Sequence, residues 1–250
     1  MERIVVTADG VPLHVLDAEG RGQPIVLLHG GGRSVADWTD VAARLSALGY
    51  RPVAIDLRGH GATPVAAWSW DAALADVASV VAALELARPA VVGHSLGGMV
   101  AALWAARHPE CPLAVNADGH GNPTSPEQFA SPGPEGGADA LLLLLREMAT
   151  GLDPLLREVM AAIDALDLLD VYVHAQCPLL IIRGRESMAE VLPDDVQGAW
   201  RAYERWTEDR LRQTADQYPN VEVVLTPTAH DVHLEAPELL ASLIDQRLPG

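Results

Sequence analysis

Apolar residues in this chain follow two spacings that alternate from one segment to the next. Short runs rich in Val, Ile and Leu predict eight strands, at residues 4–7, 13–17, 25–28, 53–55, 90–92, 113–115, 179–182 and 221–225. Longer stretches with apolar residues at helical spacing predict helices at residues 37–48, 71–86, 96–107 and 235–247. Strands that alternate with helices form a mostly parallel sheet covered on both faces, so an α/β protein is expected. No helix separates the first two strands, which are therefore expected to pair antiparallel at one edge.

A long segment between the sixth and seventh predicted strands departs from this alternation. Nine of residues 119–137 are Gly or Pro, and residues 138–170 then carry leucine-rich helical patterns. We therefore expect an α/β core of residues 1–118 and 177–250, with residues 119–176 inserted as a helical lid. Ligands of such sheets bind outside the carboxyl ends of the strands, where an apolar insertion would cover them. The same leucines also suit the core-facing side of an ordinary helix pair, and both descriptions can hold for one lid.

The most specific local motif is the pentapeptide G-H-S-L-G at residues 93–97. It follows one predicted strand and opens a predicted helix, which is the context that a G-x-S-x-G nucleophile elbow requires. Small flanking residues permit a sharp turn, and the helix N-terminus favours developing negative charge. Ser95 is therefore the candidate nucleophile, and a glycine-rich turn with an inert serine is the alternative.

A serine hydroxyl is a weak nucleophile at neutral pH and needs a neighbouring base. If the chain follows the hydrolase order of serine, acid and histidine, that base comes late in the sequence. His230 lies nearest the end of the predicted strand 221–225 and is the preferred candidate, with His233 as its competitor. Either residue could instead be a structural histidine of the loop.

Backbone donors for an oxyanion are predicted after the strand 25–28. The sequence there reads H-G-G-G over residues 29–32, so side chains do not shield the glycine amides. The amides of Gly31 and Leu96, the residue after the candidate nucleophile, are expected to converge on the developing charge. A flexible turn at the strand end is the alternative.

With these motifs the chain resembles serine hydrolases of the α/β-hydrolase superfamily over nearly its whole length. The sequence D-L-R-G-H-G at residues 56–61 is similar to the D-x-R-G-x-G loop after the fourth strand in that superfamily. The resemblance implies the α/β-hydrolase fold, a structural role for Asp56 and Arg58, and attack by Ser95 on an ester, lactone or thioester. Serine at position 95 also separates the chain from the epoxide hydrolase and haloalkane dehalogenase branches, which carry Asp there.

The acid of the triad is where the chain departs from that resemblance. Members generally carry Asp a few residues beyond the glycine that ends the seventh strand, and Ser187 stands there in this chain. Glu186 lies one residue early, whereas a second arrangement in the superfamily places the acid after the sixth strand, where this chain has Asp118. Asp118 is therefore the first choice to accept the ring N–H of His230, and Glu186 is the alternative acid. Their ordinary roles would be an Asx turn for Asp118 and a solvated loop carboxylate for Glu186.

The charge of the chain narrows its possible partners. Its 17 basic and 34 acidic residues give a net charge of -17, so nucleic acid and anionic membrane surfaces are poor partners. A small, neutral, apolar acyl compound suits this surface and the leucine-rich insertion better than a polyanion. The two cysteines, Cys111 and Cys177, form no CxxC pair, and residues 1–10 lack the features of a signal peptide, so a cytoplasmic protein is expected.

Several histidines and aspartates at predicted strand ends raise the question of a metal ion. No HxHxD or HExxH spacing occurs, and neither does G-x-G-x-x-G or a P-loop, so no metal and no cofactor is predicted. The leading interpretation is a cofactor-free serine hydrolase. A C–C hydrolase, cyclase or lyase on the same fold is the second interpretation, and a non-catalytic ligand-binding protein is the third.

Overall fold

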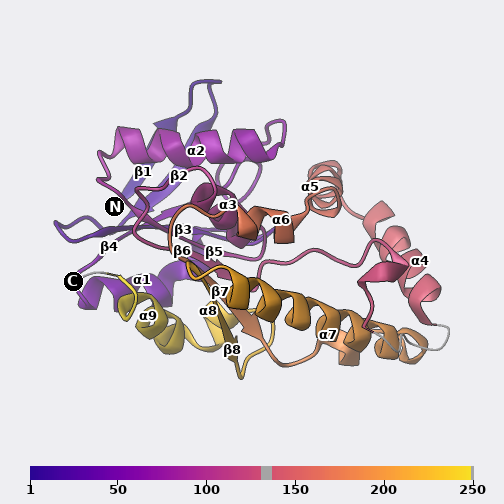
Figure 1. The fold of residues 1–250 in the computed structure, drawn as a ribbon. Coiled ribbons are helices and arrows are strands. Elements are labelled where there is room, and N and C mark those ends of the chain that lie inside the picture. The colour runs from indigo at the N-terminus through magenta and orange to yellow at the C-terminus, as the bar shows by residue number, and fades with distance from the viewer. Residues whose placement is uncertain (131–136, 249–250) are drawn as a thin grey trace.

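The computed structural model describes residues 1–130 and 137–248, and an eight-stranded sheet runs through its centre (Figure 1). The strands are β1 (Glu2–Val6), β2 (Pro12–Asp17), β3 (Pro24–Leu28), β4 (Arg51–Ile55), β5 (Ala90–His94), β6 (Ala114–Ala117), β7 (Leu179–Gly184) and β8 (Val221–Thr226). Their order across the sheet is β1-β2-β4-β3-β5-β6-β7-β8. The pairs β1–β2 and β2–β4 are antiparallel and the other pairs are parallel. The mostly parallel sheet and its antiparallel edge are therefore confirmed.

Helices cover both faces of this sheet. They are α1 (Thr39–Ala47), α2 (Trp70–Ala83), α3 (Leu96–Ala105), α4 (Gly137–Thr150), α5 (Pro154–Asp164), α6 (Leu168–Val173), α7 (Asp194–Gln217), α8 (Val232–Glu235) and α9 (Pro237–Asp245), with short 3₁₀ turns η1 (Val35–Trp38), η2 (Pro126–Gln128) and η3 (Met188–Val191). Helices α1 and α9 lie together on one face, and α2 and α3 lie on the other (Figure 1). Among the described residues no helix combines the length and the apolar character needed to cross a bilayer.

Alternate residues of the central strands pack into two separate cores. In β3, Val26 and Leu28 belong to the core under α2 and α3, whereas Ile25 and Leu27 belong to the core under α1 and α9. Successive side chains of a strand point to opposite faces, and both faces are covered here, so every residue of β3 is buried. This packing holds the parallel strands so that their carboxyl ends all lie at the same end of the sheet, and the candidate site residues lie there.

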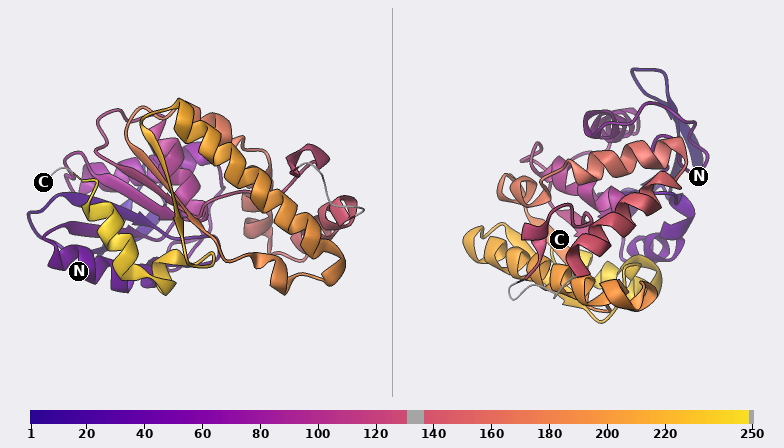
Figure 2. Two further views of the ribbon diagram at one scale, coloured as in Figure 1. Left: turned by 60° about the horizontal axis from the view of Figure 1, so that its bottom comes forward. Right: turned by 90° about the vertical axis from the view of Figure 1, so that its right-hand side faces the viewer.

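Beyond β6 the chain leaves the sheet and forms η2, α4, α5 and α6 before it returns as β7. These helices and the first half of α7 extend to one side of the sheet (Figures 1 and 2). Helix α4 packs against α7 in a third apolar cluster, which includes Leu141, Val196, Ala199 and Tyr203. Part of this cluster comes from outside residues 119–176, so the division into core and lid stays a prediction. Residues 131–136 of the Gly- and Pro-rich stretch lie outside the described residues.

Candidate active site

Ser95 lies at the carboxyl end of β5, on the turn that opens α3. Its backbone has φ 50° and ψ −115°, a combination that residues with a side chain rarely adopt. Neighbouring glycines allow the turn: a Cβ at Gly93 would overlap the Gly97 carbonyl group, and a Cβ at Gly97 would overlap the Leu28 carbonyl group. A strained serine between a strand and a closely packed helix has the geometry of a nucleophile elbow.

Asp118 and His230 lie together although 112 positions separate them in the sequence. Asp118 directly follows β6, and His230 lies in the loop between β8 and α8. The ring Nδ1 of His230 donates a hydrogen bond to Asp118 Oδ2 at 2.8 Å. Because a carboxylate only accepts, this bond puts the proton of the neutral ring on Nδ1 and leaves Nε2 as the basic nitrogen.

Backbone contacts connect the turn at Ser95 to both of these residues. The Ser95 amide donates to the carbonyl oxygen of Ala117, the residue before Asp118, at 3.0 Å. The ring Nε2 of His94 donates to the His230 carbonyl oxygen at 3.0 Å. Among the described residues no hydrogen bond joins the Ser95 hydroxyl to His230, a contact that in many enzymes forms only when substrate is bound.

The carboxylate of Asp118 is buried, and its two oxygens have different partners. Oδ1 accepts from Arg183 Nη1 at 3.0 Å and from the Gly184 amide at 3.2 Å, while Oδ2 accepts from His230. Burial raises the pKa of Asp118, but the His230 hydrogen bond and the proximity of His120 and Arg183 outweigh burial and lower it to about 2. The carboxylate is therefore ionised at neutral pH.

The alternative acid, Glu186, lies apart from this group. Its side chain is exposed, and its amide donates to the Thr228 carbonyl oxygen at 3.0 Å. In the part of the chain that the structure describes, no hydrogen bond joins Glu186 to His230. Ser187, which stands where most superfamily members carry Asp, donates instead to Glu204 at 2.6 Å.

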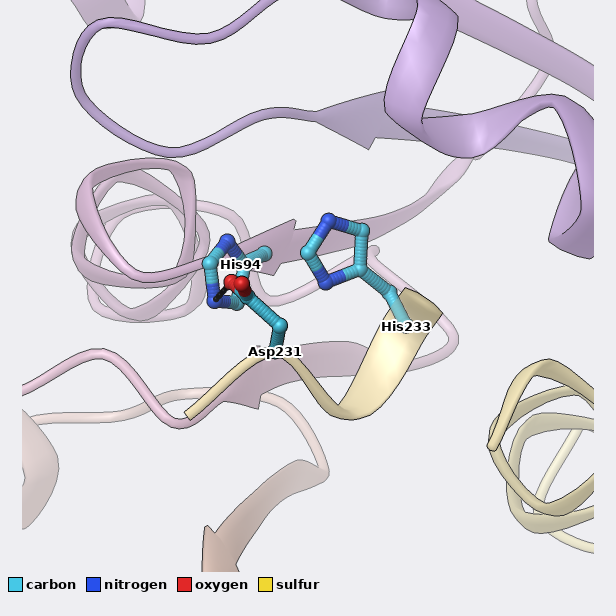
Figure 3. A group of neighbouring side chains, drawn as sticks. All are labelled: His94, Asp231 and His233. Carbon is cyan, nitrogen blue, oxygen red and sulfur yellow. Dashed lines mark ion pairs between the residues drawn. The ribbon is translucent and has the colours of Figure 1, made fainter. Parts of the chain in front are cut away.

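The competing histidine, His233, is fully buried in a cluster with His94 and Asp231 (Figure 3). Its ring stacks on the His94 ring with centroids 4.1 Å apart and planes 30° apart. Burial lowers the pKa of His233 to about 4, so the ring is neutral near pH 7. His230, at the Asp118 carboxylate, is the histidine that the structure brings to a predicted acid.

The two predicted oxyanion donors lie side by side, with Gly31 in the loop after β3 and Leu96 as the first residue of α3. The amide of Gly97 donates to the His29 carbonyl oxygen at 3.1 Å and so ties the glycine loop after β3 to the elbow. A Cβ at Gly31 would lie 4.0 Å from the Leu96 side chain, so the two residues are neighbours. Within the described ranges, neither the Gly31 nor the Leu96 amide donates to a protein acceptor, so both remain available to an oxyanion.

The loop at residues 56–61 is held by its own side chains. Asp56 accepts from the amides of Val35 at 2.7 Å and Ala62 at 2.9 Å. Arg58 makes a buried, two-bond ion pair with Asp76, at 2.7 and 2.8 Å. These contacts are those of turn-forming and salt-bridge residues, the role that the sequence resemblance implies.

Two hollows adjoin the candidate site. The smaller, about 320 Å³, lies between the glycine loops at Gly32 and residues 59–61 and the side chains of Leu155 and Leu156 on α5. The larger, about 740 Å³, is lined by Asp118 and His120 and by residues of α6, β7 and α7, and Ser95 and His230 do not line it. The larger hollow therefore adjoins the candidate acid, and the smaller one adjoins the oxyanion loop.

Among residues 1–130 and 137–248, two groups of side chains have potential metal-ligand atoms within 4.8 Å of one another: Asp118, His120 and His230, and His94, Asp231 and His233. Imidazole nitrogens bind a metal in the plane of the ring, and stacked rings such as those of His94 and His233 do not direct their nitrogens toward one shared point. Asp231 also pairs with Arg33 at 3.4 Å. The second group therefore fits packing around the His230 loop better than metal binding.

Comparison with known proteins identifies the family of the chain. A family model described as "Alpha/beta hydrolase family" matches residues 25–243. A non-heme chloroperoxidase of Streptomyces lividans is 38% identical over 106 residues, which are 41% of this chain and 38% of that protein. A bifunctional esterase/perhydrolase of Acinetobacter calcoaceticus is 37% identical over 114 residues, 44% of this chain and 41% of that protein. These alignments therefore span about two fifths of the length of the curated relatives.

Solved structures are similar over the whole chain. The thioesterase domain from the curacin biosynthetic pathway has a TM-score of 0.68 at 20% identity, and covers 98% of this chain and 99% of its own. An enol-lactonase from Burkholderia xenovorans LB400 has a TM-score of 0.68 at 22% identity and covers 98% of each chain. At these identities the likeness shows the fold and carries no information about substrate.

Proposed function

Because the chain belongs to the alpha/beta hydrolase family, we propose that it is a serine hydrolase of small esters, lactones or thioesters. In this proposal Ser95 is the nucleophile, His230 the general base and Asp118 the acid. The observation that carries it is the 2.8 Å hydrogen bond between His230 and Asp118 beside the strained turn at Ser95. A relative named as a bifunctional esterase/perhydrolase supports the same class of reaction.

The proposed reaction uses each residue for one step. His230 Nε2 takes the Ser95 hydroxyl proton while Oγ attacks the substrate carbonyl carbon, and the amides of Gly31 and Leu96 stabilise the oxyanion. His230 then gives its proton to the leaving alcohol or thiol, and an acyl-serine remains. Water, deprotonated by His230, releases the carboxylic acid and restores Ser95. Throughout, ionised Asp118 holds the ring and stabilises the imidazolium.

A small and apolar acyl group is favoured by the surroundings of the glycine loops. Leu155 and Leu156 of α5 face Gly59 and Gly32, so an apolar wall lies beside the oxyanion loop. The net charge of -17 disfavours a polyanionic substrate at long range. We assign α5 and its neighbours within residues 119–176 the role of a lid over this site.

The proposal is tested with a fluorophosphonate, which phosphonylates an activated serine. Peptide mass spectrometry is expected to find the label on Ser95 and to find none on Ser95→Ala. Ser79→Ala is the matched control, because Ser79 lies in α2 with its hydroxyl on the Ala75 carbonyl oxygen, and it should label like the wild type. Labelling at a different serine would remove Ser95 from the mechanism.

A substrate panel then separates the reaction types. Short p-nitrophenyl esters, a lactone and a short acyl thioester should be hydrolysed by the wild type and not by Ser95→Ala. A labelled Ser95 without hydrolysis of any of these compounds would contradict the acyl hydrolase and favour the C–C hydrolase, cyclase or lyase.

A further inference from the structure

We propose that Arg183 is a positioning residue that holds the Asp118 carboxylate in place for His230. This inference rests on the proposed roles of Asp118 and His230. It adds a residue of β7, the strand after which most superfamily members carry the acid itself.

The contacts of Asp118 show how it is held. Its amide donates to the Ile182 carbonyl oxygen at 2.8 Å, which continues the pairing of β6 with β7 by one residue. Its φ of 52° lies in the left-handed region, where a residue other than glycine needs outside contacts to stay. Arg183 Nη1 and the Gly184 amide supply them at Oδ1, so that Oδ2 is the oxygen left for His230. Rotation of the carboxyl group away from His230 would break both of these bonds.

Burial makes the pair of Asp118 and Arg183 mutually dependent. Asp118 is 5% exposed and Arg183 is 8% exposed. A buried charge that loses its partner is strongly destabilised, so each residue restricts the other to the observed geometry. A lysine at position 183 would keep the charge but could not reproduce the planar guanidinium.

Several other groups face the pair of Asp118 and His230. His120 follows β6, and burial lowers its pKa to about 3. His94 at the end of β5 contacts the His230 carbonyl oxygen, and burial lowers its pKa well below the usual value. Asp231 follows His230 and pairs with Arg33 at 3.4 Å. The two neighbouring histidines are thus neutral near pH 7, and Arg183 is the cation in direct contact with the carboxylate.

A positive charge near an imidazole disfavours its protonated form. Removal of Arg183 should therefore move the acid limb of the kcat/KM profile to higher pH, by about one unit. It should also free the Asp118 carboxylate to rotate, which we expect to lower kcat by roughly 10- to 100-fold, the range found when hydrogen bonds that orient metal-binding side chains are removed. KM should change little, because Arg183 contacts the carboxylate and not the reacting group.

The experiment compares Arg183→Met and Arg183→Lys with Arg185→Met, a matched control because Arg185 is exposed two residues later. Arg183→Met should show the lower kcat and the shifted acid limb. Arg183→Lys should keep the limb near its wild-type position with an intermediate kcat, and Arg185→Met should match the wild type in both. Equal pH profiles and kcat values for Arg183→Met and Arg185→Met would overturn the proposal.

A double-mutant cycle keeps the test valid if one variant is poorly stable. In an Asp118→Asn background Arg183 has no carboxylate to hold, so Arg183→Met should then cause no further loss of kcat and no further shift. Additive losses would assign Arg183 a role unrelated to Asp118. Fluorophosphonate labelling of wild-type Ser95, measured first, separates the two proposals: without it the serine hydrolase fails, whereas with it only the role of Arg183 is at stake.

Discussion

The two candidate acids differ in what they can do to the imidazole of His230. Asp118 Oδ2 receives the Nδ1 proton at 2.8 Å, whereas Glu186 has an exposed side chain. Asn at position 118 would keep the shape but favour the wrong ring tautomer, a change that in the chymotrypsin-type triad lowers kcat by about 10⁴. Asp118→Asn is therefore expected to lower kcat by orders of magnitude, and Glu186→Gln to leave it within about twofold. Steady-state kinetics on a p-nitrophenyl ester would measure both.

Each of these variants replaces a carboxylate by the amide of the same shape. Only Asp118→Asn also removes the charge that pairs with buried Arg183, because Glu186 is exposed. If Glu186→Gln lowers kcat by orders of magnitude while Asp118→Asn leaves it near the wild-type value, the acid follows β7. That result would falsify the assignment of Asp118. Urea unfolding of both variants shows whether a loss of rate reflects a loss of fold.

Residues whose chemistry is encoded in a short segment could be identified from the sequence. Ser95 stands in such a segment, since the glycines that its turn requires flank it directly. The choice of Asp118 needed a further step, because Ser187 stands at the usual acid position and only a second superfamily arrangement places the acid after the sixth strand. The contact of Arg183 with Asp118 could not be predicted from the sequence, because it depends on the conformation of a long side chain that reaches from β7 to the end of β6. The roles of all these residues stay predictions until variants are measured.

At the scale of whole elements, the buried strands and the helices on the sheet were predictable, and helix α7 was not. Its 24 residues bury a narrow stripe that includes Val196, Trp200, Tyr203 and Leu211, while most other positions are polar. The first half of this stripe packs against α4, an element distant in sequence, so the local pattern resembles a solvated loop as much as a helix. Tertiary packing, together with Asp194 and Asp195 in the first turn, stabilises it.

Gly97 lies in α3 and Gly198 in α7, and substitution of each by alanine should have opposite effects. A Cβ at Gly97 would overlap the Leu28 and His29 carbonyl groups of β3 and its loop, which cannot move aside. Gly97→Ala is expected to lower the free energy of unfolding by about 1–3 kcal/mol. Gly198 is exposed in α7 with no atom near the position of a Cβ, so Gly198→Ala should raise that free energy by about 0.5–1 kcal/mol.

Urea unfolding followed by circular dichroism would measure both glycine variants. The opposite signs are the distinctive result, because a general preference of helices for alanine would stabilise both proteins. A stabilised Gly97→Ala would mean that α3 does not pack as closely on β3 as the elbow geometry requires.

The molecule as a whole should lose stability as the pH falls below about 6.5, because it buries several histidines in the neutral form. His29 donates from Nδ1 to the Gly30 carbonyl oxygen at 2.7 Å and accepts at Nε2 from the Leu57 amide at 3.0 Å. A second proton would have to bind at Nε2, where it would displace the hydrogen bond from the Leu57 amide. Burial lowers the pKa of His29 from 6.5 to about 4, and it lowers the pKa of His233 by the same amount.

The sign of this pH effect follows from the protons bound in each state. Between pH 4 and 6.5 these histidines are protonated in the unfolded chain but remain neutral in the folded chain. The unfolded state therefore binds more protons, and the free energy of unfolding rises with pH. The stability is complete above about 6.5 and is lost progressively toward 4, by at most about 3 kcal/mol per histidine. The low pKa of Asp118 acts in a lower window, since its stabilisation is lost only as the pH falls below about 3.8.

An opposing effect comes from the net charge of -17, because acidification relieves the repulsion among the carboxylates. Salt screens the repulsion among exposed carboxylates but has little effect on the protonation of buried imidazoles. Urea unfolding at pH 7.5 and 4.5 in about 0.5 M NaCl should therefore report mainly the contribution of the buried histidines to the free energy of unfolding. His29→Asn should show a smaller loss between the two pH values than the wild type. His174→Asn is the matched control, because the His174 side chain is 67% exposed, and it should lose as much as the wild type. Equal stability of the wild type at both pH values in high salt would mean that its buried histidines are not held neutral by the fold.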